Sequence, residues 1–337
     1  MKESNYKKIL LGHGSGGKLT HELIQDILAK KLHNKYLSKL SDSAVLPLRG
    51  GELAFTTDSF VVTPLFFPGA DIGKLAVCGT VNDLVVQGAL PRYLSLAFIV
   101  EEGLSFDILN KVVDSIALAC RQAKIMVVTG DFKVVPKLAC DQMFINTSGI
   151  GEMVSPMPLS TKRIKEGDEV LVTGNIGEHG LAILSARNDL DLKIKSDCAL
   201  LSELLCPISK KFTGVMCMRD PTRGGLATTL NELAFSSGKT IRIYEEKIPI
   251  SPRARVAAEL LGVDLLYMAC EGRAIIITDH SETKAILRQL RNHTLGKNSA
   301  IIGEVVRRGP AEVLLQTSSG SQRILDMPVV DMLPRIC

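Results

Sequence analysis

Apolar residues recur along this chain with two spacings that alternate from one segment to the next. Helical spacing predicts helices at residues 18–32, 72–87, 106–123, 179–187 and 225–235. Shorter apolar runs predict strands at residues 44–48, 53–57, 60–63, 94–100, 125–129, 169–173, 241–244, 274–278 and 300–306, with 143–150 closing the first half. Because strands and helices alternate in both halves, the sequence predicts an α/β (α+β) fold with two lobes.

The length of 337 residues suits two domains of about 150 residues each. The segment 151–158 contains two prolines and separates the two halves of the pattern. We therefore expect an N-terminal domain at residues 1–155, a C-terminal α/β domain at 156–325, and a flexible tail at 326–337.

The tail ends in a thiol, that of Cys337, and contains Pro328 and Pro334. Proline disfavours helix and biases the preceding residue toward extended backbone. An extended tail of this length spans roughly 35–40 Å, enough to carry a sulfur atom from a domain surface into a cleft. The alternative is a frayed chain end that happens to finish in cysteine.

Composition argues against several classes of function. The net charge of +4, without a basic tract, does not suggest nucleic acid as a partner. No apolar run approaches the ~20 residues of a membrane span, and the N-terminus is a poor signal peptide. Eight cysteines without a C-x-x-C pair indicate neither a disulfide framework nor a zinc site, so we expect a reducing cytoplasm.

A glycine-rich segment precedes the first predicted helix and includes Gly14, Gly16 and Gly17. Its spacing matches a P-loop, but Leu19 stands where a P-loop needs a hydroxyl for Mg²⁺. We interpret the segment as a loop whose backbone amides could cover phosphates. A purely structural loop is the alternative.

Aspartates recur where predicted strands end or helices begin, and these are Asp42, Asp58, Asp83 and Asp131. Asp83 lies within an otherwise apolar helix, where a buried carboxylate is costly unless it binds a cation or a donor. Converging carboxylates repel one another, and Mg²⁺ bound to phosphates would offset that repulsion. The set therefore predicts a metal–nucleotide site, whereas each aspartate alone would suit a cap or a turn.

A second candidate site precedes the predicted helix at 225–235. Asp220 and Arg223 stand before two glycines that leave the helix N-terminus open to an anion, and the arginine fork suits phosphate. A bare helix start is the alternative. Lys133 and Glu271 are single charged residues beside apolar strands. Their position next to these motifs makes them candidate site residues.

These motifs together resemble the HypE family of carbamoyl dehydratases, hydrogenase maturation proteins related to aminoimidazole ribonucleotide synthetase and selenophosphate synthetase. The likeness runs essentially from end to end. It is carried by segments 13–17, 57–59, 64–69, 79–84, 91–95, 128–131, 220–225 and 334–337. It implies an aminoimidazole ribonucleotide synthetase-like fold, a homodimer whose N-terminal sheets form a barrel, and ATP with Mg²⁺ in a cleft near the dimer interface. Asn82 stands in the Asn-Asp element shared across that superfamily.

The resemblance also implies a reaction. Cys337 would receive a carbamoyl group from a HypF-type carbamoyltransferase. ATP would activate the carboxamide oxygen, and loss of phosphate would leave S-cyanocysteine, whose cyano group passes to iron on the HypC–HypD complex. Glu271 would be the base, with Lys133 beside it.

The same resemblance assigns Mg²⁺ to Asp58, Asp83 and Asp131, with Asp42 and Asp220 as second candidates. The sequence departs from the family at Phe132, where Thr is common, and at Pro221, where Ala is common. A bulky side chain at 132 would either disturb Lys133 or point into the core, as alternation along a strand allows.

Two other functions fit parts of the sequence. One is a small-molecule ATP-dependent synthetase of the same superfamily. A selenophosphate synthetase should carry a reactive Cys near the glycine-rich loop, and the first 77 residues contain none. The other is a non-catalytic ATP-binding scaffold, which would leave Cys337 unmodified.

Overall fold

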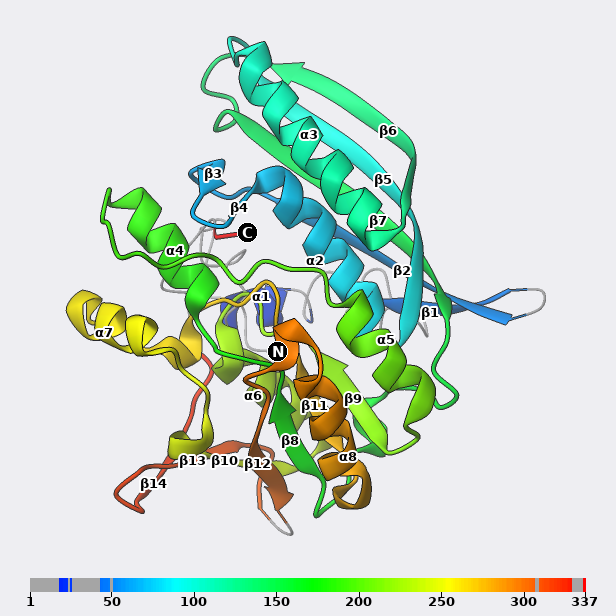
Figure 1. The fold of residues 1–337 in the computed structure, drawn as a ribbon, viewed down its shortest axis with the longest axis vertical. Helices are drawn as coiled ribbons and strands as arrows, with labels where there is room; N and C mark the ends of the chain where they lie inside the picture. The colour runs from blue at the N-terminus through cyan, green and yellow to red at the C-terminus, as the bar shows by residue number, and fades with distance from the viewer. Residues whose placement is uncertain (1–17, 24, 26–42, 49–50, 307–308, 329–335) are drawn as a thin grey trace.

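The computed structural model describes residues 18–23, 25, 43–48, 51–306, 309–328 and 336–337. They form two lobes, each built on one sheet, with helix α2 (Ile72–Val86) between them (Figure 1). In the described part of the chain, no helix is both long and apolar enough to cross a membrane.

The N-terminal lobe contains a five-stranded sheet in the order β1-β2-β7-β5-β6. Neighbouring strands are antiparallel except β5 and β6, which are parallel because the helix α3 crosses over between them. The bounds are α1 Lys18–Leu23, β1 Ala44–Leu48, β2 Gly51–Phe60, β3 Phe66–Phe67, β4 Ala70–Asp71, β5 Ala89–Glu101, α3 Phe106–Ala123, β6 Met126–Val135 and β7 Met143–Met153.

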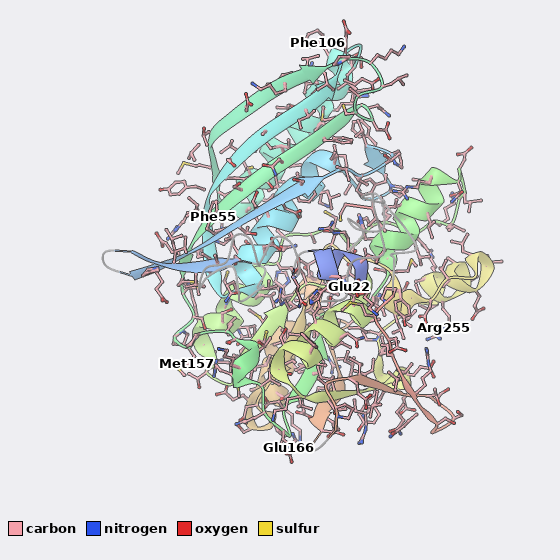
Figure 2. All side chains as sticks on the ribbon, turned by 180° about the vertical axis from the view of Figure 1, so that it is seen from behind. Glu22, Phe55, Phe106, Met157, Glu166 and Arg255 are labelled. Atoms are coloured by element: carbon pink, nitrogen blue, oxygen red, sulfur yellow. The ribbon has the colours of Figure 1, made fainter. Side chains whose placement is uncertain are left out.

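Both α2 and α3 cover the same face of this sheet (Figure 1). Helix α3 is amphipathic and buries one stripe that includes Val112 and Ile116. Helix α2 is buried almost all round, because the sheet covers one side and α5 and β9 of the other lobe cover the opposite side. Among the described residues, no helix covers the other face of the sheet, which is seen in Figure 2.

The C-terminal lobe contains a seven-stranded sheet in the order β14-β13-β10-β12-β8-β11-β9, in which only β10 and β13 pair in parallel. Its strands are β8 Glu169–Val172, β9 Val215–Arg219, β10 Thr240–Tyr244, β11 Ile275–Thr278, β12 Ala300–Val306, β13 Val313–Gln316 and β14 Gln322–Ile324. Its helices are α4 Glu178–Arg187, α5 Ser202–Lys211, α6 Gly225–Ser237, α7 Pro252–Leu261 and α8 His280–Arg291.

The predicted α/β fold with two lobes is confirmed, and α3 has the predicted bounds. The predicted strand at 53–57 lies within the longer β2, whereas only Phe60 of the predicted strand at 60–63 belongs to β2 and residues 61–63 lie outside any strand. The predicted helix at 18–32 is described only as α1, since most of the rest lies outside the described residues. The predicted domain boundary after residue 155 falls between β7 and β8, and the division itself stays a prediction.

Candidate active site between the two lobes

One turn of α2 lies at the centre of the site. At Gly79 an added Cβ would come within 2.9 Å of the Phe60 ring and 3.7 Å of Asp58 Oδ2, so the carboxylate of Asp58 lies against this turn. Four residues later, Asp83 Oδ2 accepts a hydrogen bond from Thr56 Oγ1 at 2.8 Å. Asp58 and Asp83 therefore lie between β2 and α2, about one helical turn apart.

The opposite side of the same turn joins the lobes through Asn82, whose side chain is 1% exposed. Its amide nitrogen donates to the carbonyl oxygens of Ala199, at 3.0 Å, and Glu271, at 3.2 Å. Its amide oxygen accepts from the backbone N–H of Leu201 at 2.9 Å. The amide nitrogen thus binds the segments that carry Ala199 and Glu271, and the amide oxygen binds Leu201, close to Ala199 in the sequence.

Glu271 is 3% exposed, and its backbone N–H donates to Asp197 Oδ1 at 3.1 Å. Among the described residues, its Oε1 atom has no hydrogen-bond partner. Burial, and then the negative charges of Asp220, Asp58 and Asp197, raise the pKa of Glu271 well above its ordinary value, and Arg223 partly opposes this. The structure thus gathers carboxylates of both lobes around Glu271.

Burial and the charge of Arg223 also act on the carboxylate of Asp58. Burial raises the pKa of Asp58, while the charge of Arg223 and the N–H of Ser59 lower it. Arg223 is therefore the cation that faces both Asp58 and Glu271, as expected if the two predicted sites are parts of one site.

The start of α6 forms an open cradle beside these carboxylates. Gly224 and Gly225 have φ angles of +73° and +60°, and an added Cβ at Gly225 would lie 2.5 Å from the carbonyl oxygen of Met268. The N-cap residue of this helix, Gly224, provides no side-chain hydrogen bond to it. The hydroxyl of Thr228, which is 2% exposed, has no hydrogen-bond partner among the described residues. Free backbone N–H groups at such a helix start can bind an anion.

The end of the tail lies between the lobes (Figure 1). Ile336 is 2% exposed, and its carbonyl oxygen is 2.9 Å from His179 Nε2 in α4. A main-chain oxygen of Cys337 accepts a hydrogen bond from the N–H of Val61, just after β2, at 3.1 Å. The frayed-end alternative therefore does not describe the last two residues.

Asp131 and Lys133 lie elsewhere in the chain. Asp131 aligns with Ala97, Asn146 and Ser59 across the sheet, on the face that α2 leaves uncovered, whereas Asp58 is on the α2 face. In one chain, Asp131 therefore lies on the opposite face of the sheet from Asp58, and a metal site shared by Asp58, Asp83 and Asp131 stays a prediction. Its nearest charge is Lys133, with 3.3 Å between Nζ and Oδ2.

The side chain of Phe132 points toward the core, which is the second of the two orientations considered from the sequence. Its ring packs against Phe98 with 5.7 Å between centroids, on the helix-covered face of the sheet. Lys133 is consequently directed to the opposite face by strand alternation and is not displaced by the bulky neighbour. The sheet itself separates Lys133 from Glu271 in one chain.

Several predicted residues lie outside the described part of the chain: Gly14, Gly16, Gly17 and Asp42. Sequence reasoning missed Asp197, which holds the backbone of Glu271, and His179, which holds the tail. Neither residue stands in a recognisable motif, because each acts on a partner that is far away in the sequence.

The residues present suit a nucleotide with a divalent cation. Carboxylates that raise one another's pKa would be relieved by a cation, and an open helix start beside Arg223 would suit a phosphate. The unpartnered Oε1 of Glu271 is a buried acceptor available to a substrate N–H group.

Comparison with protein families places this architecture in a known class. Models of AIR synthase related proteins match both lobes, the N-terminal domain at residues 40–153 and the C-terminal domain at 165–316. The fold of both lobes is therefore that of the AIR synthase related class.

Individual relatives narrow this assignment. The carbamoyl dehydratase HypE of Escherichia coli (strain K12) is 44% identical over 336 residues, 98% of this chain and 99% of the relative. A solved structure of HypE in complex with ATP is 45% identical and has a TM-score of 0.83, covering 98% of this chain and 100% of its own. HypE in a HypE–HypF complex is 44% identical and has a TM-score of 0.86, covering 91% and 99%. This chain belongs to the HypE family of carbamoyl dehydratases.

Proposed function

We propose that this chain dehydrates an S-carbamoyl group on its own Cys337 to S-cyanocysteine, at the expense of ATP. The carboxamide R–S–C(O)–NH₂ loses its oxygen to phosphate and two protons from nitrogen, which gives R–S–C≡N, ADP and phosphate. The cyano group would then become the CN ligand of the iron centre of a [NiFe]-hydrogenase.

The docked position of the last residue is the observation that carries this proposal. Cys337 is bound through main-chain atoms between the lobes, and the loop that holds His179 also holds Glu271. A reacting thiol on the polypeptide itself gains the rate advantage of an intramolecular reactant, because no second molecule has to be oriented.

ATP would supply the phosphoryl group that makes the amide oxygen a leaving group, and the solved HypE–ATP complex supports ATP as the nucleotide. The start of α6, with Arg223, would hold its phosphates. Asp58 and Asp83 would hold Mg²⁺, with Asp220 as a further ligand. Arg223 would also offset the negative charge that gathers near Glu271.

Glu271 is the proposed base. Its raised pKa makes it a stronger base than an exposed glutamate, and its unpartnered Oε1 is a buried acceptor in the site. The Asn82 and Asp197 hydrogen bonds hold its backbone at both the C=O and the N–H.

A second copy of the chain is the proposed partner of the uncovered sheet face. Phe55, Ile150, Tyr93 and Met126 form an aligned row across four strands, each between 37% and 60% exposed. The edge strand β6 is exposed at every residue but its last. Such an edge and apolar face favour association with another sheet. The proposed roles of Asp131 and Lys133 then require this homodimer, because both residues belong to that face and edge.

The remaining partners follow from the reaction. A HypF-type carbamoyltransferase would load Cys337, and the solved HypE–HypF complex supports this partner. A HypC–HypD complex carrying iron would accept the cyano group. We place the reaction in the cytoplasm.

Intact mass after incubation with ATP, Mg²⁺, carbamoyl phosphate and the carbamoyltransferase tests the proposal. We expect a gain of about 25 mass units, since CN replaces the thiol hydrogen, and peptide analysis should locate it on Cys337. Cys337→Ser should show no gain. An unmodified wild-type chain would instead support the scaffold function.

A further inference from the structure

His179 lies in the first turn of α4, is 0% exposed, and uses both of its ring nitrogens. Nε2 is 2.9 Å from the carbonyl oxygen of Ile336, and Nδ1 is 2.8 Å from Ser196 Oγ. The ring also packs edge-on against Phe67, with 5.5 Å between centroids. One contact is therefore with the tail and the other two are with the body of the protein.

The hydrogen-bond partners define the tautomer of this ring. A carbonyl oxygen can only accept, so Nε2 carries the proton that it donates to Ile336. Burial lowers the pKa of His179, which favours the neutral ring. Nδ1 then accepts from the hydroxyl of Ser196, whose oxygen accepts the N–H of Cys198 at 3.0 Å. The ring is thus held with its N–H directed at the tail by groups outside the tail.

Val61 supplies the second contact with the tail. Its N–H donates to a main-chain oxygen of Cys337, while His179 donates to the carbonyl oxygen of the preceding residue, Ile336. These two main-chain acceptor groups lie on either side of the Cα atom of Cys337. Holding both limits the rotation of the backbone at that Cα atom, and hence the directions in which the sulfur can point.

The loop at residues 196–199 connects this contact to the proposed base. Ser196 hydrogen-bonds His179, and the adjacent Asp197 hydrogen-bonds the backbone N–H of Glu271. His179, which binds the tail, and Glu271, the proposed base, are therefore positioned by neighbouring residues of one loop, Ser196 and Asp197.

We propose that His179 is a positioning residue that fastens the terminal dipeptide Ile336–Cys337 in the site through a main-chain carbonyl group, so that the sulfur faces the base. This inference rests on the proposed function for its role in catalysis. The fastening itself can be tested without any catalysis. The alternative is that His179 only fills the core, and the two roles lead to different labelling and stability results.

Two substitutions distinguish a role in fastening the tail from a role in the core alone. His179→Gln keeps an N–H donor at about the position of Nε2, whereas His179→Asn can still pair with Ser196 but is too short to reach Ile336. Iodoacetamide labelling of Cys337, followed by peptide mass spectrometry, reports how often the tail leaves the site. Because losing one hydrogen bond in this setting is worth about fivefold to tenfold in an equilibrium, we expect His179→Asn to label about five to ten times faster than wild type. His179→Gln should stay within about twofold. Equal labelling of wild type and His179→Asn would overturn the proposal.

A chain that ends at Arg335 provides the control for a purely structural role. In the full chain, His179→Asn should melt at a lower temperature than His179→Gln, and this difference should disappear when residues 336 and 337 are removed. An equal difference in both backgrounds would make His179 a core residue only. If His179→Asn does not fold, Ser196→Ala replaces it, because it removes the partner that orients the ring, and wild-type labelling in that variant would likewise overturn the proposal.

Single-turnover kinetics connect the fastening to catalysis. With Cys337 already carbamoylated, His179→Asn should form the cyano group about tenfold more slowly on addition of ATP, and His179→Gln should largely restore the rate. Loading by the carbamoyltransferase should not slow, since it requires the tail to be outside. If wild type itself forms no cyano group, the proposed function fails, while the labelling experiment still decides whether His179 fastens the tail.

Discussion

The side-chain amide of Asn82 donates a hydrogen bond to the carbonyl oxygen of Glu271 at 3.2 Å, across 189 positions of the sequence. Asn82 belongs to α2 of the N-terminal lobe, and Glu271 follows the C-terminal lobe segment that packs on α6. This side chain therefore helps to set the position of the proposed base relative to Asp58 and Asp83, the carboxylates proposed to bind Mg²⁺.

We expect Asn82→Ala to lower the free energy of unfolding by about 2–4 kcal/mol, because three hydrogen-bonding groups would lose a buried partner. Urea-induced unfolding measures this. Asn82→Asp is the matched control: it can still accept from Leu201 but cannot donate to either carbonyl oxygen, so it should be no more stable than Asn82→Ala. A loss below about 0.5 kcal/mol in Asn82→Ala would show that the lobes are held by other contacts.

Glu271→Gln should retain ATP binding and lose formation of the cyano group, because an amide cannot accept the proton. In wild type, the ionised carboxylate becomes more abundant as the pH rises through its raised pKa. The single-turnover rate should therefore increase with pH over a higher range than an exposed glutamate would give, and Glu271→Gln should show no such rise. Undiminished cyano formation in the variant would remove Glu271 from the role of base.

The raised pKa of Glu271 also affects stability. Whereas the reaction rate should rise with pH, the stability should fall. A buried acid whose folded-state pKa is raised binds its proton more tightly in the folded protein, so its contribution to stability is lost as the pH rises. Glu271→Gln should therefore gain stability relative to wild type between about pH 5 and pH 8. Thermal unfolding at the two pH values, without nucleotide or metal, measures this, and a parallel decline in both proteins would contradict it.

Gly225→Ala should weaken ATP binding and destabilise the fold by about 2–5 kcal/mol. Its φ angle is +60°, and the new Cβ would meet the carbonyl oxygen of Met268 at 2.5 Å. Gly238→Ala is the matched control, because its φ angle is +66° but nothing lies within 4 Å of the new Cβ, so only about 1–2 kcal/mol is expected. Calorimetry of nucleotide binding together with urea unfolding distinguishes the two, and similar results for both variants would argue against a crowded cradle at α6.

Phe55→Arg should shift the chain from dimer to monomer, because it places a charge within the aligned apolar row of the uncovered sheet face. Phe106→Arg is the control: Phe106 is 81% exposed and lies at the end of α3, away from that row (Figure 2). Sedimentation equilibrium measures both. A dimer that survives Phe55→Arg would place the interface on another surface.

The sequence predicted those parts of the fold that depend on local periodicity. Helix α3 was found because its apolar positions recur with helical spacing, whereas α2 was found as a largely apolar segment that stops at Gly88, which has a positive φ angle. Strand β6 was predicted to stop at residue 129 but continues to Val135. Gly130 allows this, since a Cβ there would lie 2.4 Å from the carbonyl oxygen of Leu96.

The site was predicted where a motif marks both the residue and its chemistry, as with Asp58, Asp83, Arg223 and Glu271. That Asp131 lies on the other face of the sheet from Asp58 in one chain could not be predicted, because the face on which a strand residue lies depends on register, which spacing alone does not reveal. Asp197 and His179 carried no signal, since their partners Glu271 and Ile336 lie 74 and 157 positions away.

Helix α2 carries Asn82 and Asp83 and is covered by one lobe on each side. Its amide protons can reach solvent only when the contact between the lobes opens or the whole molecule unfolds, so they should be among the slowest to exchange with deuterium. Fraying of loops elsewhere would leave the spacing of these two side chains unchanged. The helix expected to exchange most slowly is consequently also the element that keeps Asn82 and Asp83 at a constant separation.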